Sequence, residues 1–95
     1  MSTREKILLA IYHENRLGNS DVRYTVRHDG FRVDPQSFNQ EIQTLQNEGL
    51  IRGAVLIRDR ENSQPDQVIL NRVAITVYGL HYVKSHLLAA AGTLA

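Results

Sequence analysis

The spacing of apolar residues predicts a helix near the N-terminus, from about Thr3 to Leu17. Apolar residues recur in this stretch with the period of an α-helix. They are Ile7, Leu8, Ile11 and Tyr12. Ser2 and Glu5 stand at the spacing of a capping box, in which a hydroxyl and a carboxylate satisfy the free amides at a helix start. Gly18 is predicted to end the helix, because glycine is common just beyond a helix terminus.

The same period predicts a second helix from Asp34 to Glu48. Aspartate is a favoured N-cap, and Pro35 suits the first helical position because an amide there would have no helical partner. Val33 and Phe38 have the spacing of a hydrophobic staple. The residues predicted to face the core are Phe38, Ile42 and Leu45. The helix is predicted to end at the glycine that follows.

A third helix is predicted to begin after Thr76, whose hydroxyl suits the N-cap position. Ile75 and Leu80 repeat the staple spacing of the second helix. The residues expected to face inward are Leu80, Val83 and Leu87.

Between the second and third helices, apolar and β-branched residues predict a β-hairpin. Its strands would be Leu50 to Ile57 and Gln67 to Val73, and the polar segment Arg58 to Asp66 between them would form a wing. Apolar residues occupy both parities of each strand, although a small sheet normally buries one face. Either the last helix and the segment from Asp21 to His28 cover the second face, or a second copy of the chain or another protein does. The number of spare apolar groups favours association, most simply in a homodimer.

The segment from Asp21 to His28 allows two interpretations. Val22, Tyr24 and Val26 alternate with polar residues, which favours an additional strand. A short helix competes, because Ser20 could cap it and the two valines are four residues apart. The alternation and the β-branched residues favour the strand.

Together these elements predict one domain over residues 1–95, an α+β winged helix-turn-helix with three main helices, a β-hairpin wing and an extra strand. Two sequence motifs support it: Glu48-Gly49-Leu50-Ile51, and Ile75-Thr76-x-x-Gly79-Leu80-x-Tyr82. With these motifs the chain resembles the small winged-helix proteins of the YjcQ-like kind, found in bacteria and prophages. The resemblance is best from about Phe38 to Leu87. It implies a winged-helix fold, which serves both DNA readers and protein-interaction modules.

If the domain reads DNA, the predicted helix from Asp34 to Glu48 is the recognition helix. Its amide side chains, expected to be exposed, are Gln36, Asn39, Gln40, Gln43, Gln46 and Asn47. Asparagine and glutamine can read adenine edges through paired hydrogen bonds. However, the helix carries Asp34, Glu41 and Glu48 and no lysine or arginine, so phosphates would be repelled unless neighbours compensate. The alternative is that the amides and acids form a solvated helix face.

The cations that could compensate lie outside this helix. They are Arg23, Arg27, His28 and Arg32 before it, and Arg58 and Arg60 in the wing. Asp59 and Glu61 alternate with the wing arginines, so surface ion pairs are an equal interpretation. The candidate DNA contacts are therefore Gln36, Asn39, Gln40, Gln43, Arg27, Arg32, Arg58 and Arg60. A DNA reader normally places a supporting helix directly before the recognition helix, and residues 22–33 do not show a clean helical pattern.

Composition narrows the function further. A formal net charge of +1 gives little long-range attraction to nucleic acid. The absence of cysteine is typical of a reducing, cytoplasmic location, and no apolar run approaches the ~20 residues of a membrane span. No metal-ligand spacing, phosphate loop or nucleophile arrangement occurs, so we expect no metal, cofactor or catalysis. The leading hypothesis is a small phage- or prophage-type regulator that binds double-stranded DNA. The alternative is a winged helix that docks on a protein, such as a host factor.

Overall fold

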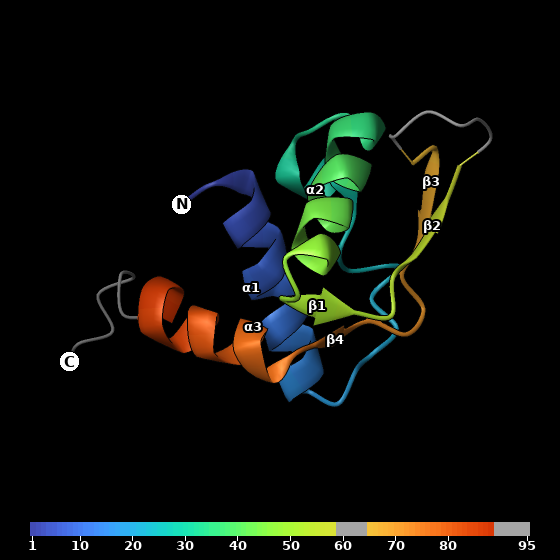
Figure 1. The fold of residues 1–95 in the computed structure, drawn as a ribbon. Coiled ribbons are helices and arrows are strands. Elements are labelled where there is room, and N and C mark those ends of the chain that lie inside the picture. Colours follow the sequence, from blue (N-terminus) through green and yellow to red (C-terminus); the bar gives the residue numbers. More distant parts are fainter. Residues whose placement is uncertain (59–64, 89–95) are drawn as a thin grey trace.

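A computed structural model describes residues 1–58 and 65–88 of the chain (Figure 1). The α-helices are α1 (Thr3–Arg16), α2 (Pro35–Asn47) and α3 (Val77–Tyr82), and a 3₁₀ helix η1 spans His28–Phe31. Helix α3 continues as a π-helical stretch, η2, over Val83–Leu88. The strands are β1 (Ile51–Arg52), β2 (Val55–Ile57), β3 (Gln67–Ile69) and β4 (Ala74–Ile75). The predicted α+β architecture of three helices and a small antiparallel β-structure is confirmed.

Helix α1 begins with the predicted capping box. The Ser2 hydroxyl accepts a hydrogen bond from the Glu5 amide at 3.1 Å, and the Glu5 carboxylate accepts one from the Ser2 amide at 2.9 Å. The Tyr82 hydroxyl also donates to this carboxylate, at 2.8 Å, and so joins α3 to the start of α1. The hydrogen bonds from the Ser2 backbone and from Tyr82 lower the pKa of Glu5, because both stabilise its charged form.

Helix α2 is capped as predicted. Asp34 accepts hydrogen bonds from the Ser37 amide at 3.1 Å and from the Ser37 hydroxyl at 2.7 Å. Phe38, Ile42 and Leu45 are buried, as their spacing predicts. The helix ends before Gly49, which has a φ of 76°.

The hairpin is antiparallel, but its strands differ from the predicted ones. The first is broken into β1 and β2, the second ends early, at Ile69, and β4 begins beyond its predicted end. Strand β2 pairs with β3, and β1 pairs separately with β4, so the described residues form two two-stranded sheets. The break between β1 and β2 falls at Gly53, whose φ is 91° and whose α-carbon lies against the carbonyl of Arg72. A side chain at this position would collide with that carbonyl. Beside the break, the Gln46 amide pairs with both backbone groups of Ala54 at 2.9 Å, which replaces a strand partner.

The strand predicted from Asp21 to His28 is wrong. Val22 and Val26 form a single helical turn, closed by a 2.9 Å hydrogen bond from the Val26 amide to the Val22 carbonyl. Both valines are buried, whereas Tyr24 between them is 75% exposed. The four-residue spacing of the valines therefore outweighs their alternation, because one turn directs both side chains into the core. The helical alternative is closer to the structure, although the turn does not extend into a helix.

The two motifs that carry the family resemblance meet in one joint, formed by Gly49, Leu50, Thr76 and Gly79. The Thr76 hydroxyl donates to the Gly49 carbonyl at 2.6 Å and accepts a hydrogen bond from the Gly79 amide at 2.9 Å. The Thr76 amide donates to the Leu50 carbonyl at 3.1 Å. The α-carbon of Gly79 lies against the same carbonyl, so closely that a Cβ would overlap it. Thr76 thus caps α3, as predicted, while holding the end of α2.

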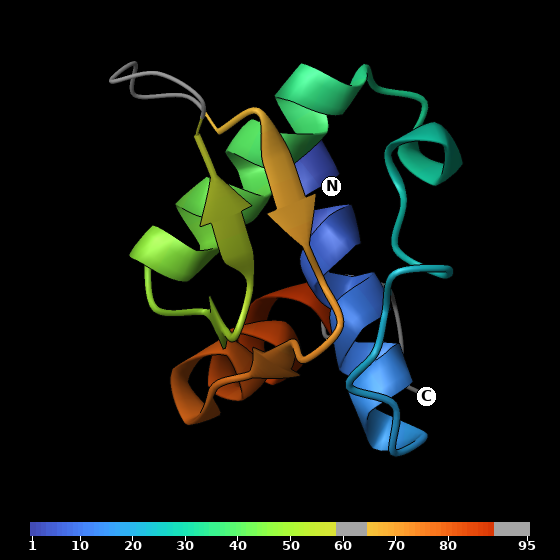
Figure 2. The same ribbon diagram turned by 90° about the vertical axis from the view of Figure 1, so that its right-hand side faces the viewer.

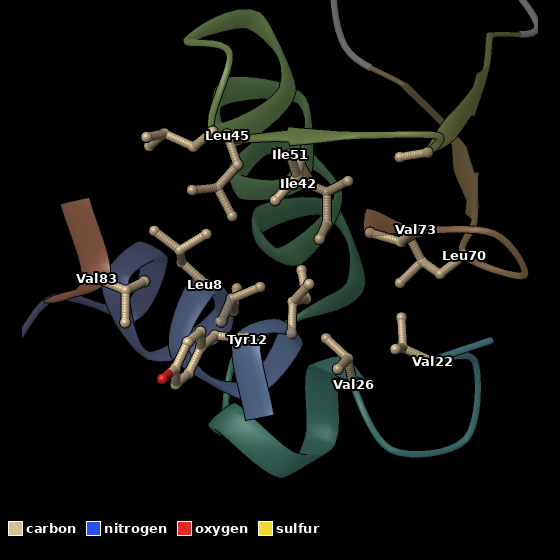
Figure 3. Packing of buried hydrophobic residues seen from close by; sticks show 14 of the residues in the cluster. Leu8, Tyr12, Val22, Val26, Ile42, Leu45, Ile51, Leu70, Val73 and Val83 are labelled. Carbon is tan, nitrogen blue, oxygen red and sulfur yellow. The ribbon is translucent and has the colours of Figure 1, made fainter. Parts of the chain in front are cut away.

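The core lies between α1, α2, the strands and the C-terminal helix (Figure 3). Its fully buried members come from every part of the described chain. They include Ile7, Leu8, Ile11, Val22, Val26, Ile42, Leu45, Ile51, Val73 and Val83. Leu87 is also buried and Leu80 is half-buried, so the predicted inward face of the last helix is confirmed.

The joint makes Gly79→Ala a sensitive variant. We expect it to lower the free energy of unfolding by at least about 2 kcal/mol, because the added methyl group must displace the Leu50 backbone. Gly30→Ala is the matched control. No atom lies near a Cβ at that position, so its stability should stay within about 0.5 kcal/mol of the parent. Urea unfolding of the three proteins tests this, and equal midpoints would show that the joint is not tightly packed.

Candidate nucleic-acid interface

The start of α2, the wing and the segment before α2 meet at one end of the molecule. Asn39 of α2 donates a 3.2 Å hydrogen bond to the carbonyl of Asp66, the last residue of the predicted wing segment. Asp66 in turn donates from its amide to the Ile57 carbonyl at 2.8 Å, beside Arg58. In Figure 1 the first turn of α2 and the far end of the β2–β3 hairpin lie at the same end. Residues far apart in sequence therefore border one surface.

The amides of α2 divide into two groups. Gln36, Gln40 and Asn47 are exposed, and Gln43 is half-buried. An amide must be exposed if it is to contact DNA bases. Asn39 is only 7% exposed, so the expectation that it faces solvent is wrong. Its hydrogen bond to Asp66 explains why a polar side chain is tolerated there. Gln46 is similarly engaged, with the backbone of Ala54.

The three acidic residues of the α2 segment have local partners. Asp34 caps the helix, and its hydrogen bonds with the side chain and backbone of Ser37 lower its pKa. Glu41 and Glu48 both face Arg4 of α1, with nitrogen–oxygen distances of 3.3 and 3.4 Å. Arg4 is a compensating cation that the sequence analysis missed, because it lies 37 and 44 residues away. These pairs are exposed and therefore weak, but they offset part of the negative charge of α2.

The candidate arginines differ in their partners. Arg27 pairs with Asp29 at 3.3 Å. Arg32 and Arg58 are exposed, and neither forms an ion pair with another residue that the structure describes. Arg32 adopts a φ of 58°, uncommon for a residue other than glycine, and it closes η1 two residues before the α2 cap. Arg60 lies outside the described residues.

The formal charges of the arginines and aspartates described at this end cancel. Within residues 21–34, 58 and 66, four arginines are matched by four aspartates. The arginines are Arg23, Arg27, Arg32 and Arg58, and the aspartates are Asp21, Asp29, Asp34 and Asp66. The hydrogen bonds from the Arg23 side chain and amide lower the pKa of Asp21, so this carboxylate stays charged at neutral pH. Among the described residues, this end of the molecule therefore has cations at defined places but no excess of positive charge.

The described part of the chain suggests neither a metal site nor a membrane span. Among those residues no group of three histidines or carboxylates is placed to hold a metal ion. Within residues 1–58 and 65–88, no helix is long and apolar enough to cross a membrane.

Three helices, a broken antiparallel wing and a joined pair of motifs define a winged-helix domain. The chain belongs to the YjcQ family, since the model of that family, described as "YjcQ protein", matches residues 6–89. The match extends the resemblance to α1 and to the segment before α2. No curated protein and no solved structure matches the chain.

The two neighbouring amides of α2 should respond differently to truncation. Asn39→Ala leaves the Asp66 carbonyl without its donor and should lower the free energy of unfolding by about 1–3 kcal/mol. Gln40→Ala removes an exposed side chain and should change stability by less than about 0.5 kcal/mol. Thermal unfolding of both variants tests this difference. If Asn39→Ala were as stable as the parent, Asn39 would not be a structural residue.

Proposed function

We propose that this protein is a small DNA-binding regulator. The observation that carries the proposal is the convergence of the exposed amides of α2 with Arg27, Arg32 and Arg58 around the first turn of that helix. In this proposal the start of α2 enters the major groove and the wing contacts the flanking backbone.

Each part of this surface has a separate role in the proposal. Gln36 and Gln40 are exposed on the first turns of α2 and would meet base edges. Arg32 lies two residues before the α2 cap and Arg58 directly follows β2; both would meet phosphates, which position the domain without reading sequence. Because four aspartates share this end, affinity for random DNA should be modest and specificity should depend on base contacts.

Binding to duplex DNA should show a shallow dependence on salt. With two or three phosphate contacts, the logarithm of the binding constant should fall with a slope of about −2 to −3 against the logarithm of salt concentration. Arg32→Glu and Arg58→Glu should weaken binding to every sequence, whereas Gln40→Ala should change sequence preference. Arg52→Glu, in β1, is the matched control and should have little effect. Fluorescence anisotropy measures all of these, and no binding by the parent at low salt would end the proposal.

A protein-binding function is the second candidate, and the outer face of the wing favours it. Val55 and Ile69 are cross-strand partners, and they are 50% and 36% exposed. Their other-face neighbours, Leu56 and Val68, pack against the core. The hairpin therefore does show apolar residues on both faces, and one of those faces is uncovered in the single chain. A homodimer that covers this face is the simplest arrangement.

A dimer formed through the wing should be broken by Val55→Asp. The charge would lie unpaired at the centre of an isologous contact, and twice in each dimer. Leu88 is a poorer site for this test because it packs against the core. Leu17→Asp is the control, since Leu17 is exposed elsewhere. Sedimentation velocity at micromolar concentration should show a dimer for the parent and the control and a monomer for Val55→Asp. A monomeric parent would exclude the dimer.

A further inference from the structure

Strand β3 has an open edge. Within the described residues, β3 pairs with β2 on one side and with no strand on the other. The segment of residues 20–26 lies beside the chain that follows β3, as Figure 2 shows, and it forms a turn rather than a strand. It contacts the backbone beyond the end of β3: the Val22 amide donates to the Leu70 carbonyl at 3.0 Å, and the Val73 amide donates to the Ser20 carbonyl at 2.8 Å.

A groove of about 260 Å³ lies between this segment, the start of α2 and β3. Val26, Phe38 and Leu70 line it and are buried, and Val68 of β3 lines it and is half-buried. An apolar lining beside an unpaired strand edge combines two features that an extended peptide needs, namely backbone groups to pair with and places for alternate side chains.

The charged residues that line the groove are mainly cationic. Arg23 and Arg27 line it, with Asp66 as its one carboxylate. Both arginines are paired with aspartates of their own segment, at 2.8 and 3.3 Å, and all four side chains are roughly half exposed. Such exposed pairs are weak, so these guanidinium groups can turn to the carboxylates of a bound segment at little cost.

The second small sheet of the domain is built differently. The Asn15 amide donates to the Val73 carbonyl at 3.1 Å and accepts from the Ile75 amide at 2.7 Å. One side chain thus occupies two backbone groups at β4, whereas at β3 the Asn39 side chain takes a single one, the Asp66 carbonyl that precedes the strand. Edge strands that lack such protection pair readily with other chains.

We propose that the groove beside β3 binds an extended segment of a partner protein, in which apolar residues alternate with acidic ones. The segment adds to β3 as a third strand, with its apolar side chains toward Val26 and Phe38 and its carboxylates toward Arg23 and Arg27. A second copy of the chain fits less well, because β3 itself contains no acidic residue. The groove shares Arg27 with the proposed DNA surface, but the inference does not depend on DNA binding.

Synthetic peptides test the proposal directly on the full chain. The probe is a heptapeptide that alternates valine with glutamate, and its match replaces every glutamate with lysine. With ¹⁵N-labelled protein, the glutamate peptide should shift the amide signals of residues 22–28 and 67–70 and slow hydrogen exchange in β3. The lysine peptide should bind more than about tenfold more weakly. Equal binding of both peptides, or shifts centred on Val55 instead, would overturn the proposal. So would duplex DNA shifting these same amides while the peptide does not.

Charge reversal supplies a second test. Arg23→Glu combined with Arg27→Glu should lower the affinity for the glutamate peptide more than about tenfold and raise the affinity for the lysine peptide. That gain for the lysine peptide also shows that the variant is folded. The matched control, Arg52→Glu with Arg72→Glu, reverses two exposed arginines that do not line the groove and should leave both affinities unchanged. If the groove variant lost affinity for both peptides while keeping the parent's amide spectrum, charge pairing in the groove would be excluded.

The two proposals can fail separately. Gln40→Ala lies outside the groove lining, so it should alter DNA preference and leave the peptide affinity unchanged. A parent protein that binds the glutamate peptide but no DNA would retain the groove and lose the regulator proposal. The reverse result would retain the regulator proposal and lose the groove.

Discussion

A close backbone approach between Gly79 and the carbonyl of Leu50 determines how the other elements are placed. It holds the first turn of α3 directly on the chain that leaves α2. Thr76 completes the contact, since its side chain and amide hydrogen bond to Gly49, Leu50 and Gly79. The next residues, Ile51 and Ile75, then pair as strands. The direction of the wing relative to α2 follows from this joint, and with it the surface that α2 and the wing share.

The joint also explains why two short motifs, some 25 residues apart, identified the fold. Each motif supplies one half of a single contact, so each motif is explained only by the presence of the other. Caps and buried stripes were predicted for a similar reason. Ser2, Asp34 and Thr76 act on residues within three positions of themselves, and such local effects can be read directly from a sequence.

What could not be predicted depends on contacts between distant residues. The turn at Val22 and Val26 is decided by a core that several other elements build, and the break at Gly53 by a carbonyl 19 positions further along the chain. For the same reason, only part of the candidate site could be predicted. The arginines and the exposed amides were found by residue type, whereas the burial of Asn39 and the pairing of Arg4 with α2 arise only in the folded chain. Charge balance at the site is likewise a property of the assembled surface.

Asn15 has a consequence for the order in which the chain folds during synthesis. Its side chain holds the backbone at Val73 and Ile75, 58 and 60 positions away, and α1 also packs against β4 and the C-terminal helix. Helix α2 covers part of α1, but β4 and the C-terminal helix, which cover the rest, are translated last among the described elements. Contacts of such high sequence separation slow folding, and apolar surface left uncovered meanwhile favours aggregation. The nascent chain must therefore leave part of the apolar surface of α1 uncovered until β4 and the C-terminal helix have left the ribosome.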